Sequence, residues 1–272
     1  MSALAHETRR LEQRGRVTQT RVFLSEWTKL RSVRSTKWSL LAAFAFTIGL
    51  PVIAATVVSH HWPHMSPHDR ADFHPLDVSL VGVQLAQLAV GVLGVLVITA
   101  EYSTGMIRAS MTAVPRRLPV LWGKGAVYAL VTVVLLTPAI VIAFFISQWI
   151  LSHRNVDISF TAPGVPRAVL GAGLYLTVIA LFAFGLGAIV RNTAGGIATF
   201  AGLMFVLPPV MNVLPTSWND AASPYVPLQA GEAIMRLHRG NQLAPWTGFG
   251  VLCCYAAAAI AIAAVLMLRR DV

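Results

Sequence analysis

Charged and histidine side chains are missing from six long parts of this 272-residue sequence. Each part is long enough to cross a bilayer as a helix, because about 20 apolar residues span its hydrocarbon core. The composition agrees: 56% of the residues are hydrophobic and 12% are charged, a much lower charged share than soluble domains have. The six charge-free stretches are 39–58, 78–100, 126–150, 168–190, 193–214 and 247–268.

Alternation of apolar and polar residues, the pattern of a membrane β-barrel strand, is also missing from these stretches. Every backbone N–H and C=O must find a partner within lipid, and a helix satisfies them inside one segment. We therefore predict an all-α polytopic membrane protein with six transmembrane helices, formed by a single domain over 38–272.

Cysteine is scarce. The two thiols, Cys253 and Cys254, are adjacent in the last stretch. Neighbouring cysteines are poorly placed to bridge each other and do not have the spacing of metal ligands. We interpret both as packing residues.

Motifs for energy conversion and catalysis are missing as well. The run at Gly123, Lys124 and Gly125 has neither the preceding glycine nor the following hydroxyl of a phosphate loop. No HExxH or GxSxG sequence occurs, which disfavours a metalloprotease or a serine hydrolase within the membrane. A proton-driven carrier needs an ionisable group inside its bundle. A channel, a scaffold or a transporter driven by another polypeptide remains, and we expect no enzyme activity and no cofactor on this chain.

The basic residues predict the orientation in the membrane. Of the 21 Lys and Arg residues, sixteen lie before the first stretch, in 101–125, at Arg191 or at the end of the chain. Basic residues concentrate on the cytoplasmic side, so both termini of a multi-pass protein should be cytoplasmic. The net charge of +10 then reflects topology and contact with anionic lipid, not nucleic-acid binding.

The N-terminal region divides in two. Residues 1–16 are polar and predict a flexible cytoplasmic tail, while 17–37 predicts an amphipathic helix in the membrane interface. A solvated helix that packs on the protein itself is the alternative. The residues that define this helix are four on its apolar face (Phe23, Leu24, Trp27 and Leu30) and two charged ones (Glu26 and Lys29).

The loop after the first stretch is rich in histidine. Imidazole and carboxylate groups together bind zinc or copper, which makes His60, His64 and His68 candidate metal ligands. Pro63 and Pro67 interrupt any helix that would align the three side chains. An ordinary polar loop without metal is the competing interpretation.

The segment 101–125 carries helical periodicity. Apolar residues recur at Met106, Ile107, Met111 and Val114, and Pro115 ends the pattern. A short helix across the cytoplasmic face, apolar on one side, can dock into a groove on a partner. A basic connector without any partner fits the same pattern.

Polar residues inside the stretches are few. Gln84, Gln87 and Asn212 are candidates for hydrogen bonds between helices or for lining a pathway. Pro138, Pro208 and Pro209 predict kinks or breaks in the third and fifth helices. Small-residue pairs at Ala183/Gly187 and Ala198/Gly202 predict close helix contacts.

The segment 215–246 is too long for a simple turn. Its residues 230–237 fit a short helix. We expect short helices here that either re-enter the membrane or pack on the external surface.

Three runs of sequence resemble the permease subunits of type-2 ABC exporters, in their actinobacterial form. The run SEWTKLRS at 25–32 resembles the N-terminal signature of that family. The run EYSTGMIR at 101–108, continued by VPRR at 114–117, resembles its first cytoplasmic loop. A weaker similarity is YVPLQAGEA at 225–233. Met106 stands where the family commonly has Thr or Ser.

The resemblance implies a partner and a mechanism. Such permeases pair as homodimers or with a paralogue, and they bind separate ABC ATPase subunits that hold ATP and Mg. By similarity, 17–35 is an interfacial connecting helix and 104–114 is a coupling helix between spans 2 and 3. Glu101 beside Arg108 is either a latch in this coupling or an ordinary ion pair. The implied coupling residues are Glu101, Thr104, Gly105, Ile107, Arg108, Met111, Val114, Arg116 and Arg117.

The function expected from these features is ATP-driven export of a hydrophobic or amphipathic substrate, such as a drug, a peptide antibiotic or a lipid. Drug or antibiotic resistance would be one result. A non-transporting scaffold or a metal-responsive sensor that uses the histidine-rich loop is the alternative.

Overall fold

The computed structural model describes residues 34–103, 117–213, 215–237 and 240–269, which form helices and turns with no strand among them. Six helices within these ranges are long and apolar enough to cross a membrane, which confirms the all-helical, six-span part of the predicted fold class. The fifth is composite, because a π-helix joins its two α-helical parts. They are α3 (Arg34–His61), α5 (Pro75–Ser103), α7 (Arg117–Ser152), α8 (Val165–Val190), α9 with η2 and α10 (Thr193–Ala201, Gly202–Val206, Leu207–Met211), and α13 (Pro245–Arg269).

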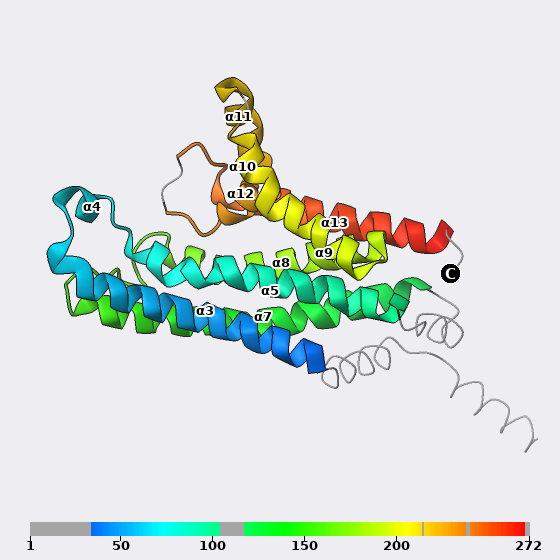
Figure 1. The fold of residues 1–272 in the computed structure, drawn as a ribbon, viewed down its shortest axis with the longest axis horizontal. Helices are drawn as coiled ribbons and strands as arrows, with labels where there is room; N and C mark the ends of the chain where they lie inside the picture. Colours follow the sequence, from blue (N-terminus) through cyan, green and yellow to red (C-terminus); the bar gives the residue numbers. More distant parts are fainter. Residues whose placement is uncertain (1–33, 104–116, 214, 238–239, 270–272) are drawn as a thin grey trace, which may run out of the picture.

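The long helices run alternately up and down between two ends of the molecule (Figure 1). At one end, called here the terminal end, α3, α7 and α9 begin and α5, α8 and α13 stop. The opposite end, called the loop end, carries η1 (Trp62–His64) and α4 (Pro67–Ala71). The first and last described residues, Arg34 and Arg269, therefore share one end, as an even number of spans requires.

The centre of the bundle is formed by α5 and α8, which contact each other and most of the other helices. Two thirds of the most apolar window of α8 is buried within the protein, against less than a quarter for α3. The close approach depends on small residues: a methyl group added at Gly94 would lie 2.6 Å from the carbonyl oxygen of Ala180. Ala183 and Gly187 both face α5 there, as their spacing predicts, whereas Gly202 has nothing within 4 Å.

Aromatic residues mark the two ends of the bundle. Trp38 and Trp122 are exposed near the terminal end, and Trp149 and Trp246 are exposed near the loop end. Indole rings favour the two membrane interfaces. The exposed surface between these ends is apolar, including Leu41, Ile53, Val134 and Ile142, as lipid contact requires.

Proline acts differently in the third and fifth spans. Pro138 lies inside α7, which continues without interruption, so the predicted break is absent there. In the fifth span the π-helix Gly202–Val206 directly precedes Pro208 and Pro209. Two consecutive residues without N–H groups leave two carbonyls of the preceding turn without helical partners, and wider π-type bonding accommodates such a disruption. The segment from α9 to α10 leans away from the other spans (Figure 1).

Gln148, near the end of α7, joins three segments at the loop end. Its Nε2 donates to the carbonyl oxygen of Pro75 (3.1 Å) and to Oγ of Ser79 (2.8 Å) on α5. Its Oε1 accepts from the backbone N–H of Ile158 at 2.8 Å. The side chain is 6% exposed, so it connects α5, α7 and the following loop from within the packed interior.

Short helices are present between the fifth and sixth spans: α11 (Thr216–Ala222), η3 (Ser223–Tyr225) and α12 (Pro227–Glu232). Of these, α12 packs deeply, whereas α11 has no buried residue. A methyl group added at Gly231 would meet the ring of Tyr175 at 2.5 Å. Tyr175 lies ten residues after the start of α8, which is about 15 Å along a helix. The end of α12 therefore lies deeper in the bundle, measured along α8 from the loop end, than the first residue of α8.

Candidate functional site

The predicted coupling segment and interfacial helix lie mostly outside the described residues. For Glu101 and Arg117 the structure describes the helical backbone alone, in the last turn of α5 and the first of α7. The flanks of the loop therefore both lie at the terminal end. The residues that fall outside are Thr104, Gly105, Ile107, Arg108, Met111, Val114 and Arg116 in the loop, and Phe23, Leu24, Glu26, Trp27, Lys29 and Leu30 before α3.

Next to this loop, Arg191 ties three helices together at the terminal end. Its backbone has a φ of +58° and its N–H donates to the Gly187 carbonyl oxygen at 2.9 Å, which ends α8. Its Nη2 donates to the carbonyl oxygen of Leu266 on α13 at 3.1 Å. Its guanidinium carbon lies 5.3 Å from the ring centre of Tyr102 on α5, within range of a cation–π contact.

Residues 191–193, called here the Arg191 corner, make a further link to α5. Thr193 Oγ1 donates to Thr99 Oγ1 at 2.8 Å. Asn192 accepts from the N–H of Gly195 at 2.9 Å and so caps α9. The corner thus joins α8, α9 and α13 to the part of α5 that leads directly into the loop at 104.

Lys124, near the start of α7, is 4% exposed. Lysine is rarely buried so fully unless its charge is paired. The terminal end therefore has a buried cation in α7 as well as the Arg191 corner.

Two of the predicted polar residues have different environments although they are neighbours on α5. Gln87 is buried, and its Oε1 accepts a hydrogen bond from the hydroxyl of Tyr175 on α8. Gln84 is exposed and lines a cavity. Gln87 therefore joins helices, whereas Gln84 faces open space.

Asn212, the third predicted polar residue, is exposed in the turn after α10 and does not line the Gln84 cavity.

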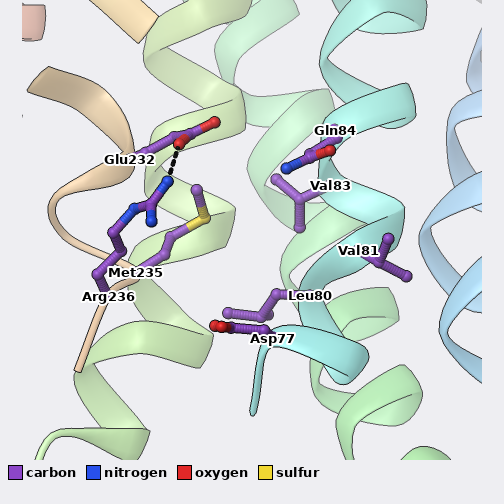
Figure 2. Close-up of a pocket in the computed structure, with 8 residues that line it drawn as sticks. All are labelled: Asp77, Leu80, Val81, Val83, Gln84, Glu232, Met235 and Arg236. Atoms are coloured by element: carbon purple, nitrogen blue, oxygen red, sulfur yellow. Dashed lines mark hydrogen bonds and ion pairs between the residues drawn. The ribbon is translucent and has the colours of Figure 1, made fainter. Parts of the chain in front are cut away.

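The cavity beside Gln84 has a volume of about 270 Å³ and lies between α5 and the chain that follows α12. Figure 2 shows Asp77 and Gln84 on one side, with their polar ends directed toward Glu232, Met235 and Arg236 on the other. We call it the loop-end cavity. It is lined by Asp77, Leu80, Val81, Val83, Gln84, Glu232, Met235 and Arg236.

An ion pair forms one wall of the loop-end cavity. Arg236 Nη2 lies 2.8 Å from Glu232 Oε2, and the Glu232 side chain is 12% exposed. The charge-free stretches predict a bundle without ionisable groups, whereas Lys124, just before the third stretch, is buried in α7. The segment between spans 5 and 6 also brings the Glu232 carboxylate against the bundle, directly after Gly231, which packs on Tyr175.

Sequence reasoning missed Tyr175 and the position of Glu232. A hydroxyl-bearing residue in the middle of a charge-free stretch is a signal for the first. Glu232 stands within the third run of the resemblance, but its contacts come from residues far away in the sequence.

The histidine-rich loop is organised around arginine. Arg70 Nη2 donates to the carbonyl oxygens of Trp62 and Pro63, each at 3.0 Å. His60 lies in the last turn of α3, His64 in η1 and His68 in α4, where its Nε2 is 3.5 Å from Asp72 Oδ2. Across the described ranges, no three His, Cys, Asp or Glu residues are grouped so that they could hold a metal ion.

Comparison with known proteins did not identify a family, because neither a protein-family model nor a curated protein matches the chain. The six span-capable helices, with tryptophan at both ends and an apolar surface between, define a multi-pass helical membrane protein.

Proposed function

We propose that this chain is the membrane-spanning permease subunit of an ATP-driven ABC exporter. It pairs with a second copy or a paralogue, and a separate ABC ATPase supplies ATP and Mg. Both termini lie in the cytoplasm of a bacterium, and the bilayer is the plasma membrane. The single observation that carries the proposal is the run EYSTGMIR with VPRR at 101–117, placed between the second and third of six spans.

The arrangement of the described residues is compatible with a mechanism in which the ATPase subunits move the permease by displacing this loop. Its two flanks, the end of α5 and the start of α7, share the terminal end with the start of α3. The Arg191 corner connects the last turns of α5 to three other helices. A displacement of the loop by closing ATPase subunits would be passed to these helices through direct contacts.

The alternative class, a metal-responsive sensor, depends on His60, His64 and His68. These residues lie in three different elements, the last turn of α3, η1 and α4, and no observation of the structure favours their joint action. A non-transporting scaffold is tested by the same experiment as the exporter.

The test is coupling to the ATPase. The full chain is co-expressed with the ABC ATPase encoded by a neighbouring reading frame, and the complex is purified and placed in liposomes. We expect Ile107→Asp to abolish substrate-stimulated ATP hydrolysis, because a charge on the apolar face would prevent docking in the ATPase groove. Membrane insertion should be unchanged.

Thr112→Asp is the matched control, since it adds the same charge on the opposite face of the predicted helix. Stimulated hydrolysis should persist in this variant. If Ile107→Asp also keeps full stimulation, 104–114 is not the coupling helix. If no ATPase co-purifies with the unaltered chain, the exporter proposal fails.

A further inference from the structure

The loop-end cavity combines one unpaired charge with an apolar wall. Glu232 and Arg236 neutralise each other across 2.8 Å. Among the described residues, the Asp77 carboxylate has neither an ion pair nor a hydrogen bond, and it points into the cavity (Figure 2). The lining therefore carries a net charge of about −1, from two carboxylates and one guanidinium.

A second positive group lies close by but outside the lining. Arg167 Nη2 donates to the carbonyl oxygen of Arg236 at 3.0 Å, so its guanidinium is directed at the main chain of that segment. An adjacent cavity of about 230 Å³ shares Asp77 and Arg236 with the first. Asp77 thus stands where the two cavities meet and where a ligand from either would approach.

The depth of the cavity adds to the argument. Gln84 lies nine residues into α5, or about 14 Å along the helix. Its amide has no hydrogen bond to any residue that the structure describes. Polar groups at membrane depth face protein or a water-filled cavity. In Figure 2 the amide nitrogen of Gln84 is directed toward the opposite wall, which leaves the Asp77 carboxylate as the acceptor for an N–H donor on this face of α5.

The remaining wall selects for an apolar body. Leu80 and Val83 are buried on the α5 side, and the thioether of Met235 projects between the two walls (Figure 2). Methionine adapts to ligands of varied shape. A divalent metal ion needs several oxygen ligands, and the described residues offer no group of three carboxylates or histidines.

We propose that the loop-end cavity binds an amphipathic organic amine, with its ammonium group on Asp77 and its apolar part against Leu80, Val83 and Met235. As the class of the exported substrate, this assignment rests on the proposed function. Binding itself needs no ATPase, so the two proposals fail separately.

The test uses the full chain in nanodiscs of zwitterionic lipid and equilibrium dialysis with radiolabelled probes. The probes are 2-phenylethylammonium, neutral 2-phenylethanol and anionic 2-phenylacetate, which share one apolar body. We expect the ammonium to bind most tightly. Asp77→Asn should weaken it about tenfold, because a charge-assisted hydrogen bond is lost.

Two variants make the result specific. Asp77→Glu keeps the charge and should keep binding, and Asp72→Asn removes an exposed carboxylate outside the cavity and should change nothing. Equal binding of the ammonium to the unaltered chain and to Asp77→Asn overturns the proposal. So does tighter binding of the alcohol, which indicates apolar partition only, or of the acid, which would assign the site to Arg236.

Discussion

At the scale of single residues, buried amides hold the loop end together. Gln148 makes three hydrogen bonds to backbone and hydroxyl groups of α5 and the loop after α7. Its replacement by an apolar residue of similar size leaves the Ile158 N–H without this partner, whereas Ser79 Oγ still donates to the Pro75 carbonyl oxygen at 3.4 Å. A buried group that loses its partner costs more than the average hydrogen bond contributes.

We therefore predict that Gln148→Leu lowers the free energy of unfolding by about 1–3 kcal/mol. The measurement is an SDS titration of the purified chain in mixed micelles, followed by circular dichroism. Gln84→Leu is the control, because the Gln84 side chain is exposed and has no hydrogen bond to a described residue. Similar losses in the two variants would show that the Gln148 network does not contribute.

Sequence analysis identified the polar residues of α5 but not which role each one has. Gln87 was a candidate for joining helices or lining a pathway, and it joins helices through Tyr175. Gln84, three residues away, has the same side chain but faces a cavity. The difference is set by α12 and its following turn, which pack nearby only in the folded chain. Glu232 was missed for the same reason.

At the scale of elements, the Arg191 corner is a rigid joint between α8 and α9. Arginine rarely adopts a positive φ, and here its side chain has contacts on both neighbouring helices, Leu266 on α13 and Tyr102 on α5. The backbone turn and the side-chain contacts are separable by mutation. Glycine favours the turn but has no guanidinium.

We predict that Arg191→Gly leaves the complex with the ATPase assembled and lowers substrate-stimulated ATP hydrolysis about tenfold, as expected for loss of about 1.4 kcal/mol of coupling free energy. Basal hydrolysis should change little. The measurement compares stimulated and basal turnover in liposomes. Arg269→Gly, which removes an exposed arginine at the same end, is the control. Equal stimulation in both variants would show that the corner does not transmit the displacement.

The sequence predicted the boundaries of the spans well, because each span follows the length of an uninterrupted charge-free stretch. The six charge-free stretches all fall within the six span-capable helices or extend them by a few residues. The effect of proline was less predictable. One isolated proline is tolerated within α7, while two consecutive prolines follow a π-helix in the fifth span. One proline removes one backbone hydrogen bond from a turn of α7, whereas two consecutive prolines remove two from a turn of the fifth span. This number, not the presence of proline as such, distinguishes the two spans.

At the scale of the whole molecule, the two ends should lie on opposite sides of the membrane. The described Lys37, Lys124, Arg191 and Arg269 belong to the terminal end, and Asp157 lies in the loop after α7 at the other end. The basic side should be cytoplasmic.

We predict that a membrane-impermeant maleimide labels Asp157→Cys in intact cells and labels Arg269→Cys only after lysis. Both substitutions are made with Cys253 and Cys254 replaced by Ala, because Cys254 is exposed. The readout is the mass shift of the purified chain. Labelling of Arg269→Cys in intact cells would reverse the orientation and exclude a cytoplasmic ATPase contact at 104–114.

The unequal spans also bear on the surrounding lipid. The third span contains 32 residues and the composite fifth span 19, which correspond to helices of about 48 Å and about 28 Å. The hydrocarbon core is about 30 Å thick. The acyl chains must therefore stretch beside α7, or α7 must tilt, while no such adjustment is needed beside α9 and α10. In the first case, the bilayer is thicker beside α7 than beside the leaning fifth span.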